Sequence, residues 1–320
     1  MKKIILIGGD PNSINSEIIF KSWRKISNTL KKKIYLVSNY NLIKDQSKKL
    51  KFSIKVCKVK SLEDKNNSDS LKIIDINLKY SRPFNVPIKE ASKFVKKSLI
   101  IGHHLALNKN VLGLINCPID KTLLRRNNMG VTEFLASKCN IKNNSEVMLI
   151  WNKKFSVSPI TTHIDLKDVS KNLKSKIILN KINTINDSFK RIFKKKPKIG
   201  ILGLNPHNAE MKKNSEEKKL IIPSILRMRK KGINLKGPLV SDTLFINDFK
   251  NYDVIVGMYH DQVLTPFKTI FKFDAINITL GLNYLRVSPD HGVAKDLILK
   301  NKANPKSLIE CIKFINKFGI

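Results

Sequence analysis

The sequence of 320 residues has few cysteines, no Cys-x-x-Cys pair and no long apolar run. Its four cysteines are widely spaced, which argues against a zinc ribbon or a disulfide framework and favours reduced, buried thiols. No apolar run approaches the ~18 residues that a transmembrane helix needs. The apolar run at residues 4–7 is also too short for the central region of a signal peptide. We therefore expect a cytosolic protein in which residues 4–7 form a first buried strand.

Acidic side chains are also scarce, because 25 Asp and Glu stand against 61 Lys and Arg, giving a formal charge of +36. The lysines are scattered along the chain, with local runs at 31–33 and 190–198. One interpretation is a lysine-rich, solvated surface with no specific partner. The other is attraction of anionic substrates, or weak and salt-sensitive binding of nucleic acid. Charge alone leaves both interpretations open.

The apolar residues predict the fold class. They make up 42% of the chain, which is enough for a sizeable core and argues against intrinsic disorder. Short apolar runs alternate with stretches of helical period, which predicts an α/β enzyme with two lobes. The predicted strands are 4–7, 34–37, 98–101, 111–115, 199–204 and 254–258, and the predicted helices are 17–30 and one from 166 to beyond 192.

Three of the six histidines share one setting, because His163, His207 and His260 each follow a strand-like stretch. In open α/β sheets, ligands gather beyond the carboxyl ends of the strands. Imidazoles at three such ends can converge on one divalent metal, and three protein ligands with an open position are typical of a catalytic site. The alternative is three separate histidines that cap strands or bond to loops. The spacing of the histidines does not decide between these two interpretations.

The segments around these histidines carry longer motifs. In chain order they are Thr161-Thr162-His163, Gly203-Leu204-Asn205-Pro206-His207, Gly237-Pro238-Leu239 with Asp242-Thr243-Leu244-Phe245, Met258-Tyr259-His260-Asp261-Gln262, Leu280-Gly281-Leu282 with Arg286, and Ser288-Pro289-Asp290-His291-Gly292. With these motifs in this order, the chain resembles the 4-hydroxythreonine-4-phosphate dehydrogenase family of pyridoxal phosphate biosynthesis. The resemblance runs from Gly9-Asp10-Pro11 to Asp296, essentially end to end.

This resemblance implies an oxidoreductase that uses NAD or NADP and one divalent metal per site, either Zn, Co, Mn or Mg. The implied reaction is the oxidation of 4-phosphohydroxy-L-threonine, followed by decarboxylation to 3-amino-2-oxopropyl phosphate. A metal held by neutral imidazoles lowers the pKa of a substrate hydroxyl, which favours the loss of hydride. We expect this small phosphorylated substrate as the partner, and neither a membrane nor nucleic acid.

The resemblance also implies the two-domain α/β fold of isocitrate and isopropylmalate dehydrogenases, with the active site in the interdomain cleft. The lack of a Gly-x-Gly-x-x-Gly motif agrees with that fold. We expect residues 1–130 and 281–320 to form a first α/β lobe, and residues 131–280 to form a second lobe that carries the metal histidines. The family forms homodimers whose metal site takes ligands from both subunits, so the three histidines need not meet within one chain.

The resemblance assigns roles to polar and cationic side chains. The ammonium of Lys268, the amide of Asn277 and the guanidinium of Arg286 suit the phosphate and the carboxylate of a substrate. Arginine can bind either anion through two hydrogen bonds. The implied metal ligands are His163, His207 and His260, and the implied substrate contacts are Thr132, Lys268, Asn277 and Arg286.

Three more residues are candidates for catalysis. Asp242 and Asp261 are candidates for support of the metal ligands or for proton transfer, and Asp242 is an equally good loop cap. Lys121 matches the Pro-x-x-Lys segment of the family, where it would lie near substrate or form a plain salt bridge. For His291 we expect a structural role or a place beside the cofactor, not metal ligation.

The chain departs from the family in its loops. Val131 stands where the family has a substrate-contacting histidine, and a valine can neither donate a hydrogen bond nor carry charge. Glycines of the family are missing at Asn12–Ser16 and at Asn208–Lys213. Three hypotheses remain: the vitamin B6 pathway enzyme, a paralogous dehydrogenase for phospho-threonate or phospho-erythronate, and a non-catalytic protein that binds anions or nucleic acid. Val131 favours the second and the charge favours the third, but the retained site residues weigh against the third.

Overall fold

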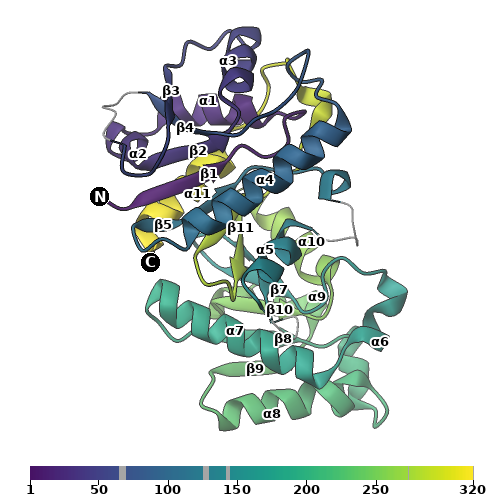
Figure 1. Cartoon of the computed structure of the whole chain (residues 1–320). Helices are drawn as coiled ribbons and strands as arrows, with labels where there is room; N and C mark the ends of the chain where they lie inside the picture. Colours follow the sequence, from purple (N-terminus) through teal and green to yellow (C-terminus); the bar gives the residue numbers. More distant parts are fainter. Residues whose placement is uncertain (65–69, 125–129, 142–144, 273, 320) are drawn as a thin grey trace. The chain divides into compact units, whose positions relative to one another are not determined.

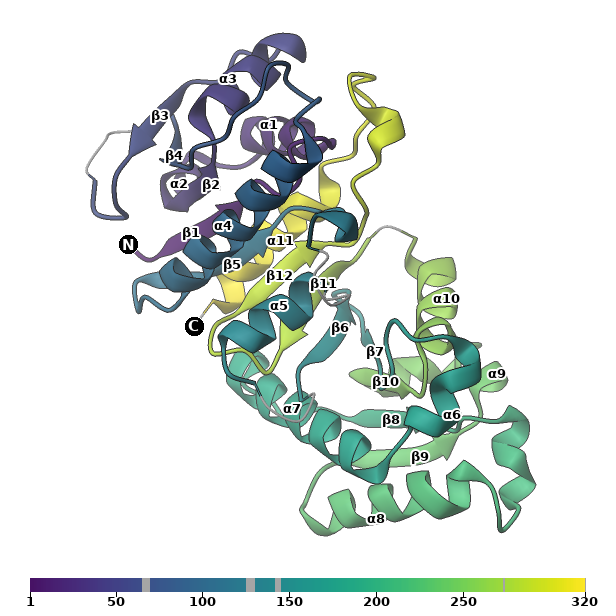
Figure 2. The same ribbon diagram turned by 45° about the vertical axis from the view of Figure 1, so that its right-hand side comes forward.

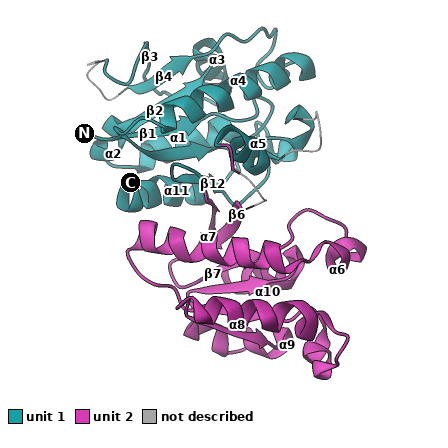
Figure 3. Ribbon diagram, turned by 60° about the horizontal axis from the view of Figure 1, so that its bottom comes forward, with its two compact units in different colours: residues 1–139, 282–320 teal, residues 140–281 magenta. Residues whose placement is uncertain are grey.

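The computed structural model describes residues 1–64, 70–124, 130–141, 145–272 and 274–319. The chain divides into two compact units: unit 1 consists of residues 1–139 and 282–320, and unit 2 of residues 140–281 (Figure 3). The sequence placed the first boundary between residues 130 and 131. In the structure this boundary lies after Cys139, so helix α5 (Val131–Lys138) belongs to unit 1 and not to the unit that carries the three histidines.

Unit 1 is built on a parallel sheet (Figure 1). Its strand order is β3-β4-β2-β1-β5-β12, and each neighbouring pair is parallel. The central strands are almost entirely apolar because helices cover both faces of the sheet. The strands are β1 (Lys3–Ile7), β2 (Ile34–Ser38), β3 (Val56–Val59), β4 (Leu71–Asp75), β5 (Val111–Asn116) and β12 (Arg286–Pro289).

Two helices cover opposite faces of this sheet. Gly102 of α4 lies against Leu114 of β5, whereas Ile315 of α11 lies against Gly113. Because successive residues of a strand point to opposite faces, α4 and α11 pack on different sides. The helices of unit 1 are α1 (Asn15–Lys25), α2 (Asn28–Lys33), α3 (Tyr40–Lys49), α4 (Ile88–Ala106), α5 and α11 (Lys306–Phe318), with short 3-10 turns at Lys121–Leu124 and Lys295–Leu297.

The strand predicted at residues 98–101 was wrong, because these residues lie inside α4. The buried residues Ala91, Val95 and Leu99 recur at every fourth position and mark one face of a helix. The three consecutive apolar residues at 99–101 fit a strand equally well, so only the longer period separates the two structures.

Unit 2 is built on a mixed sheet of order β11-β6-β7-β10-β8-β9. Strand β6 is antiparallel to both neighbours, and β7, β10, β8 and β9 are parallel. The carboxyl ends of these four parallel strands therefore meet at one edge of the sheet. The strands are β6 (Val147–Trp151), β7 (Ser156–Pro159), β8 (Ile199–Leu202), β9 (Leu235–Leu239), β10 (Val254–Gly257) and β11 (Ile276–Leu280).

The helices of unit 2 pack on this sheet, with α7 against β6 and β11 and α10 against β7 and β10 (Figure 2). The single helix predicted from residue 166 is interrupted, because Leu173 and Lys174 have extended backbones. Its second part buries one apolar stripe, which includes Ile182, Ile185 and Phe189. The helices are α6 (Val169–Asn172), α7 (Ser175–Phe193), α8 (Ile222–Lys230), α9 (Ser241–Leu244) and α10 (His260–Phe271), with short turns at Leu166–Asp168, Pro206–Met211, Glu217–Ile221 and Asp248–Asn251.

The cysteines agree with the expectation from the sequence. All four are free thiols, and Cys117, Cys139 and Cys311 are buried. Burial raises the pKa of the Cys117 thiol, which keeps it protonated. In the part of the chain that the structure describes, no helix has both the length and the apolar character needed to cross a membrane.

Candidate functional site

The three histidines of unit 2 follow three neighbouring parallel strands. His163 follows β7, His260 begins α10 directly after β10, and His207 follows β8. Because β7, β10 and β8 are adjacent and parallel, all three histidines lie beyond strand ends at the same edge of the sheet. The placement beyond carboxyl ends matches the usual position of ligand sites in such sheets.

Two of these histidines lie side by side. The ring centres of His163 and His260 are 5.7 Å apart, and the ring planes are inclined by 41°. The Nδ1 of His260 is 2.6 Å from Oδ1 of Asp261, so the carboxylate can hold the proton on Nδ1 and direct Nε2 away. A carboxylate in this position is the usual support of a metal-binding imidazole. His163 and His260 therefore fit two ligands of the predicted metal site.

His207 does not join this pair. Within the described ranges, no three His, Cys, Asp or Glu side chains lie close enough together to hold one metal ion. His207 is exposed and begins a turn in which His207, Asn208, Ala209 and Glu210 all have left-handed backbones, with φ between 49° and 56°. Within the described residues, one chain thus brings two imidazoles together at one place.

Four other predicted residues belong to unit 2. Asp261 is 79% exposed, and Asp242 is an exposed residue of α9. Lys268 is half-buried on α10, the same helix that begins with His260. Asn277 lies on β11, and its Oδ1 is buried without a hydrogen-bond partner among the described residues. An orphaned buried oxygen is costly, so this amide fits a ligand contact.

Unit 1 holds the predicted substrate residues Arg286 and Thr132 in direct contact. Arg286 is 3% exposed, and its Nη1 donates a hydrogen bond of 3.3 Å to Oγ1 of Thr132. Its Nε donates a hydrogen bond of 2.7 Å to Oδ1 of Asn116 at the end of β5. Burial lowers the pKa of Arg286 to about 10, because it penalises the charged form. An anionic ligand at this guanidinium would offset that penalty.

Asn116 is a site residue that the sequence did not identify. Its side chain orients the Arg286 guanidinium across the β5–β12 pair. A signal was present, because Asn116 is a polar residue at the carboxyl end of the strand predicted at 111–115.

The other predicted residues of unit 1 are exposed or half-buried. Lys121 is exposed, and the salt bridge of its segment is made by Asp120, whose Oδ2 is 2.5 Å from Nζ of Lys295. This contact lowers the pKa of Asp120 to about 2. Val131, half-buried, is the first residue of α5 and directly precedes Thr132. Val131, which stands where the family has a histidine, is therefore the chain neighbour of Thr132, and Thr132 contacts Arg286.

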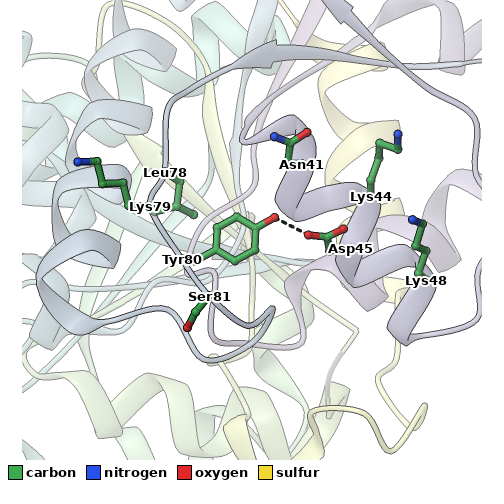
Figure 4. Close-up of a pocket in the computed structure, with 8 residues that line it drawn as sticks. All are labelled: Asn41, Lys44, Asp45, Lys48, Leu78, Lys79, Tyr80 and Ser81. Atoms are coloured by element: carbon green, nitrogen blue, oxygen red, sulfur yellow. Dashed lines mark hydrogen bonds between the residues drawn. The ribbon is translucent and has the colours of Figure 1, made fainter.

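A separate pocket of unit 1, about 570 Å³ in volume, contains none of the predicted residues. Tyr80 lies at its centre and donates a hydrogen bond of 2.7 Å to Oδ2 of Asp45 (Figure 4). Burial, and then Asp45, raise the pKa of Tyr80. The lining residues are Asn41, Lys44, Asp45, Lys48, Leu78, Lys79, Tyr80 and Ser81.

Known proteins resemble this chain over its whole length. Residues 30–315 match the family described as pyridoxal phosphate biosynthetic protein PdxA. The 4-hydroxythreonine-4-phosphate dehydrogenase of a Sulfurihydrogenibium species is 36% identical over 322 residues, which cover 98% of this chain and 97% of that protein. The enzyme of the same name from Aquifex aeolicus is 36% identical over 324 residues, with the same coverage.

A solved structure extends this similarity to the fold. The 4-hydroxythreonine-4-phosphate dehydrogenase of Klebsiella pneumoniae is 27% identical and superposes with a TM-score of 0.87. The match covers 99% of this chain and 99% of that one. The α/β fold predicted from the sequence is therefore confirmed.

Proposed function

Because the chain belongs to the PdxA family of pyridoxal phosphate biosynthetic proteins, whose relatives named above are dehydrogenases, we propose that it oxidises 4-phosphohydroxy-L-threonine with NAD or NADP. The proposed product of oxidation and decarboxylation is 3-amino-2-oxopropyl phosphate. Two features of the chain carry the proposal. They are the adjacent imidazoles of His163 and His260 in unit 2, and the buried guanidinium of Arg286 with the hydroxyl of Thr132 in unit 1.

The imidazole pair supports a divalent metal at the edge of the unit 2 sheet. His163 and His260 would hold it, with Asp261 fixing the proton of His260 on Nδ1. The chemistry that such an ion supplies is a lowered pKa of a substrate hydroxyl and stabilisation of the negative charge left by decarboxylation. Imidazole ligands favour Zn, Co or Mn over Mg.

The third imidazole is proposed to come from a second copy of the chain. The support for this proposal is that His207 is exposed and stands apart from the His163–His260 pair. A homodimer with two such shared sites satisfies the need for three protein ligands and an open position. Lys268 and Asn277 of unit 2 are proposed as substrate contacts.

Arg286 and Thr132 are proposed to bind an anionic group of the substrate. The guanidinium is pre-oriented by Asn116 and the hydroxyl of Thr132, so little conformational freedom is lost when the anion binds. Arginine is suited to this task because its N–H groups match the oxygens of a phosphate or a carboxylate. Asp242, Asp261 and Lys121 are proposed as candidates for proton transfer.

A second candidate function follows from Val131. The side chain beside Thr132 cannot donate a hydrogen bond, so a substrate group that the family's histidine contacts would be left without that partner here. A substrate that lacks this group suits the site better. The alternative is therefore a dehydrogenase for phospho-threonate or phospho-erythronate with the same metal chemistry.

The test is reduction of NAD and NADP by the purified chain, with 4-phosphohydroxy-L-threonine and the two alternative substrates. Each assay is run after metal removal and with added Zn, Co, Mn or Mg. His260→Ala and His207→Ala should abolish turnover, whereas His104→Ala, which removes an exposed histidine of α4, should leave it unchanged. Turnover of only an alternative substrate would establish the second function, and metal-independent turnover would contradict both.

A further inference from the structure

One glutamine connects the loops that carry the proposed metal ligands. Gln262 is the third residue of α10 and lies in the Met258-Tyr259-His260-Asp261-Gln262 motif, and the proposed function gives it no role. It is half-buried at the edge of the unit 2 sheet that carries the three histidines.

The side chain of Gln262 makes three hydrogen bonds to three loops. Its Oε1 accepts a bond of 2.6 Å from the backbone N–H of Met258, in the loop after β10. Its Nε2 donates a bond of 2.7 Å to the backbone oxygen of Gly203, in the loop after β8, and one of 2.9 Å to Oγ of Ser241, which begins α9 after β9. Both N–H donors of the amide and its oxygen are engaged.

Met258 extends this connection to a fourth loop. Its backbone oxygen accepts a hydrogen bond of 2.7 Å from Oγ1 of Thr161 and one of 3.1 Å from the backbone N–H of Thr161, in the loop after β7. Thr161 is two residues before His163, and Met258 is two residues before His260. The adjacent imidazoles of the proposed site are therefore held together through Met258.

The backbone around Gln262 leaves little room for another arrangement. A Cβ atom on Gly257 would lie 2.6 Å from Cγ1 of Val263 and 2.9 Å from Oε1 of Gln262. A side chain at residue 257 would push Gln262 away from the Met258 N–H. Glycine at residue 257 therefore allows the side chain of Gln262 to approach the backbone this closely.

We propose that Gln262 is a positioning residue that fixes the His260 and His207 loops relative to each other and to Ser241–Asp242. It binds neither metal nor substrate, and it acts through the backbone of the residues that precede the histidines. This inference rests on the proposed function, because it treats the histidines as metal ligands. Loss of such a supporting contact typically weakens metal binding by about 10- to 100-fold.

The decisive variant is Gln262→Glu. It keeps the size of the side chain and an acceptor for the Met258 N–H, but it loses both donors and sets a carboxylate against the Gly203 oxygen. We expect cobalt(II) to bind about 10- to 100-fold more weakly in an isothermal titration of the native assembly, with a changed visible spectrum of the bound ion. The spectrum reports ligand geometry, which a general loss of stability would not alter.

The matched control is Asn152→Asp. Asn152 is also a buried amide of unit 2 that donates to a backbone oxygen, that of Asp274, but it lies at the opposite end of β7 from Thr161. Its cobalt affinity and spectrum should equal those of the wild type. His260→Ala, which removes a proposed ligand, shows how far the cobalt affinity falls when one ligand is lost.

The outcomes separate the inference from the proposed function. If wild-type protein neither binds cobalt nor turns over substrate, the proposed function fails. If the wild type binds and Gln262→Glu binds equally well with the same spectrum, the inference is wrong. Should Gln262→Glu not fold, Thr161→Val and Ser241→Ala decide, since each removes one hydrogen bond of the network: unchanged cobalt spectra in both would overturn the inference.

Discussion

The two units present their candidate functional groups in different ways. In unit 1, Arg286 is 3% exposed and donates hydrogen bonds from β12 to Asn116 and Thr132. In unit 2, the histidines lie just beyond strand ends, with His260 at the start of α10, and Asp261 beside His260 is 79% exposed. The proposed anion contact is thus built into a core, whereas the proposed metal contact lies at strand ends that polar side chains hold in place.

This difference determines which parts of the site can change. A residue in a packed core has few permitted neighbours, while loops tolerate substitution if their backbone hydrogen bonds remain. Of the departures from the family, the loop after His207 fits this rule, and Arg286 and Thr132 are retained. Val131 of α5 and residues Asn12–Ser16 lie in unit 1 and do not fit it. The two units can therefore be tested separately.

The largest effect is expected for Arg286→Met. The variant removes the charge at similar volume, but it leaves the buried Oδ1 of Asn116 without its donor, so a loss of about 1–3 kcal/mol in stability is expected beside the loss of binding. We expect kcat/KM to fall on the order of 10²- to 10³-fold, because an anion in the site loses its buried charged partner. Kinetics and thermal melting measure both quantities, and Arg227→Met on the exposed face of α8 is the control. Equal kcat/KM for variant and wild type would remove Arg286 from the substrate site.

The next effect concerns the loop that carries His207, in the variant Glu217→Gln. Glu217 is fully buried, and its Oε1 accepts hydrogen bonds of 2.8 Å from the backbone N–H groups of Leu204 and Asn205. A glutamine has one acceptor fewer and sets an amide against N–H donors, so we expect a loss of about 2 kcal/mol in the free energy of unfolding at pH 7. Exposed Glu210→Gln should cost much less.

The pH dependence of this loss has a definite sign. Burial raises the pKa of Glu217, but the hydrogen bonds from Asn205 and Leu204 outweigh it and hold the pKa below its ordinary value of 4.5. A carboxyl with a lowered pKa in the folded state stabilises the protein above its unfolded pKa and loses this contribution as pH falls. The difference between wild type and Glu217→Gln should therefore shrink below about pH 4.5 in urea unfolding. A difference that grows on acidification would contradict the assigned role.

A smaller effect is expected for Val131→His, which returns the family's residue to the anion site of unit 1. If 4-phosphohydroxy-L-threonine is the substrate, one new hydrogen bond should raise kcat/KM by about 10-fold. Val131→Ala, which changes size without adding a donor, should not. If the chain acts on phospho-threonate or phospho-erythronate, the histidine should give no gain with those substrates, and steady-state kinetics with all three compounds distinguishes the cases.

The sequence predicted β1, β2, β5, β8 and β10, because these strands are buried and appear as continuous apolar runs. It did not identify β3, β4, β6, β9, β11 or β12. It failed at residues 98–101, where a short apolar run belongs to the helix α4. It also located the strand ends at which His163, His207 and His260 lie. What it could not provide is the set of hydrogen bonds between distant residues, such as Arg286 to Asn116, 170 positions apart, and Gln262 to Gly203, 59 apart. These hydrogen bonds depend on the order of the strands in the sheet, and no local sequence pattern encodes that order.

The smallest predicted effect tests the loop after His207, where the family has glycines. Ala209 has φ 51°, in the left-handed region that costs a residue with a Cβ atom about 1–2 kcal/mol. Glycine removes this cost but loses more entropy on folding, about 0.5–1 kcal/mol, so Ala209→Gly should raise the stability by up to about 1 kcal/mol. Ala136→Gly, inside the helix α5, should lower it by a similar amount. Opposite shifts in the melting temperature would show that the His207 loop holds backbone strain; two equal decreases would show that it does not.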